Sequence, residues 1–192
     1  MLATATRTET LPMEVRLITG EELLAMGDIG PSELIDGRIV RMPPTAEYHG
    51  AYEGNFYKEL RAYVDKHELG KVRVGEVGIF IHRNPDRIRA ADALFISNER
   101  AARRSSSGFM DVAPELVVEI LSPDDAWSDV IDKLRDYFSA GVLLVWVADP
   151  KSRSVFAYRS LTDVNEFTEN DDLPGEDVLP GFKVRVSILF EE

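Results

Sequence analysis

Three acidic side chains lie within segments whose other residues are typical of buried strands. Asp92, Glu119 and Glu76 each interrupt a run of apolar and β-branched residues. Side chains alternate between the two faces of a strand, so Asp92 and Glu119 each share a face with their apolar second neighbours. An ionised carboxylate on such a face is costly unless it is paired or binds a metal ion. One such acid is typical of an ion pair or a strand end, whereas two on neighbouring strands favour a divalent-metal site.

The chemistry of these acids favours Mg²⁺ or Mn²⁺, with Asp92, Glu119 and Glu76 as the expected ligands. Carboxylate oxygens are hard ligands that suit both ions. The chain has no cysteine, which excludes a thiol nucleophile, a disulfide framework and cysteine-ligated zinc. Its three histidines show no HExxH spacing, which disfavours zinc further. The sequence also lacks a glycine-rich phosphate loop and a G-x-S-x-G motif.

Lys133 and His49 are the candidates for handling charge beside such a site. In the helix expected after the Glu119 strand, Lys133 lies roughly 40° outside the apolar arc at 100° per residue. Its side chain either reaches solvent, as lysines at helix margins commonly do, or extends towards Glu119. His49 opens a long helix, where a phosphate contact and simple exposure to solvent are equally good interpretations. Spacing alone does not choose between these alternatives.

Hydrophobic patterning predicts the elements of the N-terminal third. Thr19-Gly-Glu-Glu22 has the form of a capping box and predicts a short helix to about Met26. Asp36-Gly37 between two apolar runs predicts a β-hairpin. Aromatic and leucine residues at helical spacing predict a long helix over residues 47–68, with Gly70 as its C-terminal glycine.

Strands around one further helix are expected in the rest of the chain. Ser122 and Pro123 predict the N-cap and first residue of that helix, which should continue to about Ala140 and stop at Gly141. The strands on either side of this helix should be parallel. The prediction is an α/β fold with a mixed central sheet flanked by helices on both faces. The expected strands are residues 72–82, 88–96, 115–121, 142–148, 154–159 and 183–190, with a loop at 100–108.

The length of 192 residues fits one domain, expected over residues 17–192 after a flexible N-terminal tail at 1–16. The tail lacks the apolar segment of a signal peptide. The longest apolar run, Val142–Ala148, is far short of the roughly 20 residues that span a bilayer. With no cysteine and no membrane segment, a cytoplasmic protein is expected.

The net charge of −12, from 22 basic and 34 acidic residues, opposes binding to nucleic acid. The charge is uneven, because Ser160–Glu192 holds nine acids and two bases, a local −7. Arg83–Arg104 holds six arginines and three acids, a local +3. These arginines are interpreted either as solvated surface charge, the commoner case, or as a patch that faces phosphates.

The sequence resembles the putative restriction endonuclease family of the PD-(D/E)XK nuclease superfamily from about Thr19 to Phe190, nearly the whole chain. The resemblance rests on short motifs, each weak alone but specific when they occur in this order. The motifs are Glu33–Val40 (ELIDGRIV), His49-Gly50, Gly75–Gly78 (GEVG), Arg89–Asp92 (RAAD), Pro114–Pro123 (PELVVEILSP), Lys133–Tyr137 (KLRDY), Gly141–Pro150 (GVLLVWVADP) and Val178–Phe182 (VLPGF).

This resemblance implies a restriction-endonuclease-like fold with a metal-dependent nuclease site. It matches Asp92 to the aspartate of the family's PD element and Glu119 to its second acid. It also matches Glu33 to the family's N-terminal glutamate and Glu76 to an acid on the first core strand. The expected catalytic residues are Asp92, Glu119, Lys133, Glu33 and His49.

Two positions depart from the pattern of the superfamily. Ala91 replaces the proline of the PD element, which affects only the backbone. Leu121 stands two residues after Glu119, where the superfamily usually has lysine. Lys133 matches a lysine common in this family, and the resemblance implies that it supplies the charge instead.

These features favour a Mg²⁺- or Mn²⁺-dependent endonuclease that acts on nucleic acid, with DNA a better substrate than RNA. Restriction-type nucleases that cut both strands often dimerise, so a homodimer is expected at the level of the family. The alternative is a catalytically inactive binding or accessory module, which the acidic charge and Leu121 both favour. A glycosidase with paired carboxylates is a third reading, but no aromatic sugar platform accompanies these acids.

Overall fold

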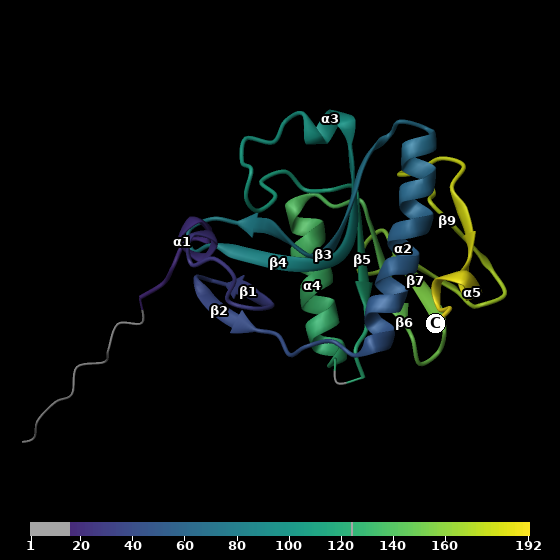
Figure 1. Ribbon diagram of the computed structural model, residues 1–192, viewed down its shortest axis with the longest axis horizontal. Helices are drawn as coiled ribbons and strands as arrows, with labels where there is room; N and C mark the ends of the chain where they lie inside the picture. The colour runs from purple at the N-terminus through teal and green to yellow at the C-terminus, as the bar shows by residue number, and fades with distance from the viewer. Residues whose placement is uncertain (1–15, 124) are drawn as a thin grey trace, which may run out of the picture.

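The computed structural model describes residues 16–123 and 125–192, and it contains a mixed β-sheet between helices (Figure 1). The tail expected at residues 1–16 falls almost entirely outside the described residues. The helices are α1 (Gly20–Ala25), α2 (Glu47–Lys66), α3 (Asn98–Ala101), α4 (Trp127–Ala140) and α5 (Val186–Leu189). The strands are β1 (Ser32–Ile35), β2 (Arg38–Arg41), β3 (Gly70–His82), β4 (Arg87–Ser97), β5 (Leu116–Ile120), β6 (Leu144–Asp149), β7 (Ser154–Tyr158), β8 (Val164–Phe167), β9 (Asp172–Pro174) and β10 (Lys183–Arg185). Within these ranges, no helix has both the length and the apolar character needed to cross a membrane.

The main sheet has the strand order β2-β1-β4-β5-β6-β7-β8, and β3 pairs with β4 in addition. β4 and β5 are antiparallel, whereas β5 and β6 are parallel, with Glu119 beside Val147. The parallel pair is the one expected on either side of α4. The mixed α/β sheet expected from the sequence is confirmed.

β4 positions the candidate site because it changes partners along one of its edges. On one side, β3 pairs with it over almost its full length. On the other side, β1 pairs with it at Ile88, and β5 pairs with it from Ala93 to Phe95. Asp92 lies between these two partners, at the point where β4 leaves β1 and joins β5.

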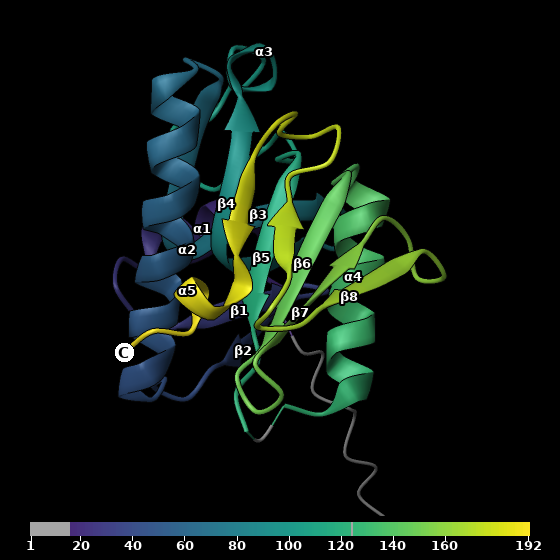
Figure 2. The same ribbon diagram turned by 90° about the vertical axis from the view of Figure 1, so that its right-hand side faces the viewer.

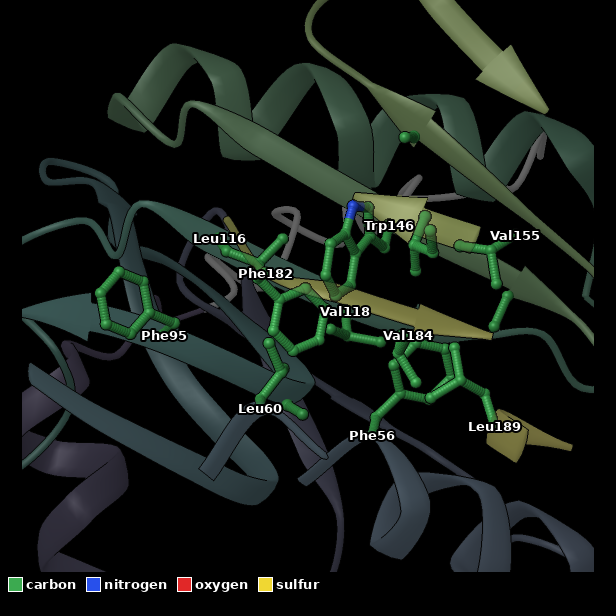
Figure 3. Packing of buried hydrophobic residues seen from close by; sticks show 14 of the residues in the cluster. Phe56, Leu60, Phe95, Leu116, Val118, Trp146, Val155, Phe182, Val184 and Leu189 are labelled. Carbon is green, nitrogen blue, oxygen red and sulfur yellow. The ribbon is translucent and has the colours of Figure 1, made fainter. Parts of the chain in front are cut away.

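α2 covers one face of the sheet, and Figure 2 shows it on the opposite side from α4. Phe56 and Leu60 of α2 pack in a buried cluster with Val118 of β5 and Trp146 of β6. Figure 3 shows these four side chains gathered on this face. The side chains at helical spacing therefore form the face of α2 that packs against the sheet.

α4 covers the other face. Its Leu134 and Tyr137 pack in a second cluster with Val117 of β5 and Val145 of β6. Since side chains alternate along β5, Glu119 points to the same side as Val117. The carboxylate of Glu119 therefore lies on the face of the sheet that α4 covers.

Several local predictions are confirmed in detail. Thr19 and Glu22 form the capping box of α1. Asp36 and Gly37 form the turn between β1 and β2, and both have positive φ angles (51° and 75°), as type I′ hairpin turns require. Gly141 ends α4 in the left-handed conformation, with φ of 101°.

The start of α4 differs from the prediction. The helix begins at Trp127, after Ala126, and not at Pro123. Its N-cap is Ala126, without a side-chain cap, and the Asp125 carboxylate accepts the N–H of Ser122 (2.8 Å). The N–H of Asp125 in turn donates to the Ser122 carbonyl (3.1 Å). These contacts form a turn that precedes the helix.

Two further boundaries differ from the prediction. Glu68, with φ of 53°, takes the left-handed position after α2, and Gly70 is the first residue of β3. The strand expected at residues 183–190 is the short β10 followed by α5. Val186 and Leu189 are both buried in one helical turn, whereas a strand would place residues three apart on opposite faces. β8 and β9 were not predicted.

Candidate active site

Asp92 and Glu119 occupy matching positions of two adjacent strands. The register of β4 and β5 pairs Ala93 with Val118, so Asp92 and Glu119 occupy the next position along both strands. Only 9% of Asp92 and 6% of Glu119 is exposed. The structure therefore brings the two acids together as buried neighbours across one strand pair.

Asp92 contacts the backbone of β5 just beyond the last paired position. Its Oδ2 accepts the N–H of Ile120 (2.6 Å). Burial, and then the charge of Glu119, raise the pKa of Asp92 well above its ordinary value, which the Ile120 N–H and Lys133 offset only in part. Its other oxygen, Oδ1, accepts no hydrogen bond from the described part of the chain. One carboxylate oxygen thus maintains the strand end, and the other remains available to a ligand.

His49, in the first turn of α2, is buried against this strand end. It is 3% exposed, so the interpretation as a solvated helix-start residue is wrong. Its Nε2 lies 3.1 Å from the Ile120 carbonyl oxygen and 3.5 Å from Asp92 Oδ2. A carbonyl only accepts, so Nε2 carries the proton. His49 therefore binds the end of β5 beside Asp92 and does not face solvent.

Two donors from α4 occupy both oxygens of Glu119. Lys133 Nζ donates to Oε2 (2.6 Å), and the Tyr137 hydroxyl donates to Oε1 (2.5 Å). The Lys133 side chain therefore extends inward to Glu119, although 25% of it remains exposed. Burial alone would lower the pKa of Lys133, but the carboxylates of Glu119 and Glu33 raise it above its ordinary value.

Glu33, on β1, is a third buried acid beside Lys133. Its Oε1 accepts the N–H of Ala90 (3.1 Å), and its Oε2 accepts a hydrogen bond from Arg89 Nη1 (2.7 Å). Lys133 Nζ lies 3.9 Å from Oε1. The structure therefore gathers all the catalytic residues expected from the sequence: Asp92, Glu119, Lys133, Glu33 and His49.

Comparison with known proteins identifies the family. Residues 21–187 match the family model described as "Putative restriction endonuclease" (Uma2). The chain belongs to this family. A solved structure from Anabaena variabilis, described as a putative nuclease belonging to DUF820, shares the fold with a TM-score of 0.75. The two chains are 23% identical over 90% of this chain and 97% of that one. No curated protein matches the sequence.

The structure shows what replaces the lysine that the superfamily pattern expects at Leu121. Leu121 packs at the margin of the cluster that faces α4. Lys133 brings an ammonium group to Glu119 from the helix, 14 residues along the chain from that acid. The site therefore contains a lysine, although the residue two positions after Glu119 is apolar.

Glu76, the third metal ligand expected, lies on a bulge of β3. The register there passes from Val74–Ala93 to Val77–Ala91, and Glu76 has φ of 44°. No hydrogen bond or ion pair within the described residues joins it to Asp92 or Glu119. No three or more His, Asp or Glu side chains of this part of the chain form a group that could hold a metal ion. The three-acid metal site is not assembled, which leaves Asp92 and Glu119 as the candidate ligands.

Sequence reasoning missed two residues of the site. Its apolar spacing on α4 accounts for the full burial of Tyr137, but not for its hydroxyl, which donates to Glu119. Glu53 lies on α2 one turn after His49, and its Oε1 is buried without a hydrogen-bond partner among the described residues. Burial raises the pKa of Glu53, with a further contribution from Glu76 that the Gly75 backbone opposes. The four-residue spacing from His49 was the available signal for Glu53.

The arginines of residues 83–104 do not form a free patch that faces phosphates. Every one of the six pairs with an acidic side chain, and the side chain of Arg89 is only 12% exposed. The pairs are Arg83–Asp86, Arg87–Asp36, Arg89–Glu33, Arg100–Glu115, Arg103–Glu99 and Arg104–Asp111. Each of these arginines therefore already has an acidic partner, either inside the fold or, as for Arg103, at the surface.

Proposed function

We propose that the protein is a metal-dependent endonuclease that hydrolyses phosphodiester bonds, with DNA a better substrate than RNA. The observation that carries this proposal is the contact of Lys133 with Glu119 beside the buried Asp92. Two carboxylates that can hold a cation and one ammonium that can face a phosphate are the charges that this reaction needs. Membership of the restriction endonuclease family supports nuclease chemistry and a DNA substrate.

The carboxylates suit Mg²⁺ or Mn²⁺ by their chemistry. Asp92 and Glu119 offer only oxygen donors, which hard cations prefer. Asp92 Oδ1 accepts no hydrogen bond from residues 16–123 and 125–192. Burial and the charge of Glu119 raise the pKa of Asp92, and Lys133 offsets this only in part, so further positive charge beside the two acids would be favourable. A divalent ion held by Asp92 and Glu119 would supply that charge.

When bound, a divalent ion would lower the pKa of a coordinated water and neutralise charge that develops on the phosphate. The residues of the chain would orient this chemistry. Lys133 would donate hydrogen bonds to a non-bridging phosphate oxygen or to the attacking water. Tyr137 would hold the Glu119 carboxylate at Oε1, as it does here, and His49 would hold the end of β5 beside Asp92. Glu33 would keep Lys133 beside the two acids.

An inactive binding or accessory module is the second candidate function. Two observations favour it: no three-acid metal group is assembled in the described residues, and both oxygens of Glu119 are already engaged. The net charge of −12 also opposes tight binding of nucleic acid. Turnover is the property that separates the two functions.

Cleavage assays with the full chain test the proposal. The protein is incubated with Mg²⁺, Mn²⁺ or EDTA and with supercoiled, linear and single-stranded DNA and RNA. We expect cleavage of DNA with either metal ion, and none with EDTA or for Asp92→Ala. Asp149→Ala is the matched control, because it removes a carboxylate from the end of β6, outside the site. Light scattering of the same preparation tests the expected homodimer.

The result that refutes the proposal is an absence of metal-dependent cleavage by the folded wild-type protein on every substrate. Cleavage that survives Asp92→Ala refutes it as well, because the activity then arises elsewhere or from a contaminant. Metal-dependent binding of nucleic acid without cleavage supports the accessory module instead.

A further inference from the structure

We propose that Arg89 is a positioning residue that fixes α4 relative to β1 and β4 and thereby sets where Lys133 meets Glu119. This inference rests on the proposed function of the site, for which Lys133 must be held in one place. Among the described residues, Arg89 forms no hydrogen bond or ion pair with Asp92 or Glu119. Arg89 acts through two other carboxylates.

Arg89 joins β1 to α4. Its Nη1 donates to Glu33 Oε2 (2.7 Å), and its Nε donates to Asp136 Oδ2 (2.6 Å). The Arg89 side chain is 12% exposed, and those of Glu33 and Asp136 are 6% and 10% exposed. Water therefore screens these pairs weakly, and their geometry is tightly constrained.

The same contacts return to Lys133 and close a ring. Asp136 lies three residues after Lys133, so the two side chains are on neighbouring parts of one helix surface. Glu33 accepts from Arg89 and lies 3.9 Å from Lys133 Nζ. Charges alternate along these contacts, from Lys133 through Glu33 and Arg89 to Asp136, and the backbone of α4 closes the ring. Rotation or sliding of α4 would break at least one buried pair of this ring.

The shape of the arginine side chain suits this bridging role. Its planar guanidinium presents donors in several fixed directions, whereas a lysine ammonium acts from one point. Arg87 reinforces the arrangement, because its Nη1 donates to Asp136 Oδ1 (3.0 Å) and its Nη2 to Asp36 Oδ2 (2.7 Å). Both oxygens of Asp136 are thus fixed by β4, and the helix position is defined from two sides.

Position matters more here than the number of ion pairs. Buried ion pairs are weak evidence for stability, because desolvation opposes the attraction between the charges. They do define one geometry, and a misplacement of about 1 Å at a catalytic group can reduce the rate on the order of 100-fold. The ring therefore serves the placement of the Lys133 ammonium.

The test compares Arg89→Met and Arg89→Lys with Arg100→Met. Arg100 is the matched control, because it is also largely buried and bonds to the carbonyl of Gly141 at the end of α4, but it does not belong to the ring. For each full-length variant we measure kcat and KM for DNA cleavage and the melting temperature. In protein with ¹⁵N-labelled lysine we also measure the Lys133 Nζ resonance, assigned with Lys133→Arg.

For Arg89→Met we expect kcat to fall on the order of 100-fold, with KM changed by less than about twofold. Arg89→Lys keeps the charge but not both bonds, so we expect an intermediate loss. The Lys133 resonance should move in both variants and stay in place in Arg100→Met. If Arg89→Met does not fold, the comparison of Arg89→Lys with Arg100→Met decides.

Two results overturn the inference. One is an equal loss of kcat in Arg100→Met at a similar melting temperature, which would reduce Arg89 to a general stabilising role. The other is a Lys133 resonance that does not change when Arg89 is replaced. The resonance is measured without substrate, so it tests the inference even if the wild-type protein fails to cleave any nucleic acid.

Discussion

Replacement of Lys133 by methionine should destabilise the protein, because it leaves Glu119 buried without its cation. Removal of one partner from a buried pair commonly costs 3–5 kcal/mol. Two features lower that figure here: Lys133 is 25% exposed, and Tyr137 still donates to Glu119 Oε1. We therefore expect a loss of about 2–3 kcal/mol in the free energy of unfolding. For a chain of this length, that corresponds to a fall of roughly 4–12 °C in melting temperature.

A second substitution should restore most of this loss. In Lys133→Met with Glu119→Gln, the uncompensated charge is gone, and the amide oxygen of the glutamine can still accept from Tyr137. Replacement of both partners of a buried pair is often nearly neutral. The double variant should therefore be more stable than Lys133→Met alone, although it carries one more substitution.

Urea unfolding at neutral pH measures these differences, with Lys151→Met as the control. Lys151 is exposed in the turn after β6, so its replacement should change stability by less than about 0.5 kcal/mol. The reasoning is refuted if the free energy of unfolding of the double variant falls by the sum of the losses measured for Lys133→Met and Glu119→Gln alone. It is equally refuted if Lys133→Met is no less stable than the Lys151→Met control.

Three further predictions follow from the same contacts. The pKa of Asp92 is raised by burial and by Glu119, so the native protein keeps a proton that the unfolded chain has released, and stability is lost as the pH rises from the ordinary value of 3.8 towards the raised one. Asp92→Asn should remove this loss and be the more stable protein at neutral pH. The prediction is contradicted if the free energies of unfolding of the two proteins change equally between pH 4 and 8. Mg²⁺ or Mn²⁺ should raise the melting temperature by mass action, and Glu119→Gln should abolish most of the rise; a full response in that variant would place the ion elsewhere. Tyr137→Phe leaves Glu119 Oε1 without its donor, so the free energy of unfolding should fall by about 1–3 kcal/mol and kcat should fall too. Unchanged values in urea unfolding and cleavage assays would show that the hydroxyl does not orient the acid.

Elements with strong local signals were predictable from the sequence. The capping box at Thr19, the Asp36-Gly37 turn and the stop at Gly141 each depend on residues that are close together in the chain. The start of α4 failed for a related reason. Ser122 and Asp125 both have side chains suited to a cap, but they bond to each other in a turn before the helix, and the N-cap, Ala126, has no side-chain cap. Local propensity shows which residues can cap a helix, but not whether they do.

The two central acids were predictable because each violates the apolar pattern of its strand. Their geometry was not, since it depends on β4 leaving β1 for β5 at Asp92, a feature of the sheet and not of either strand. Glu76 violates a strand pattern too, but it lies on a bulge of β3 and no hydrogen bond or ion pair among the described residues joins it to the pair. An acid in a strand is therefore a good indicator of a special position and a poor indicator of which site it serves.

The residues around the acids were harder to predict because their partners are distant in sequence. Arg89 is 56 residues from Glu33 and 47 from Asp136, and Arg87 is 51 from Asp36. A count of charge in a local window gave +3 for this segment and could not reveal that Arg87, Arg89, Arg100 and Arg104 pair with acids outside it. The pairing also changes the functional argument. Because Arg87 and Arg89 beside the candidate site are engaged inside the fold, the proposed function assigns the positive charge that would meet a phosphate there to Lys133 and to a divalent ion.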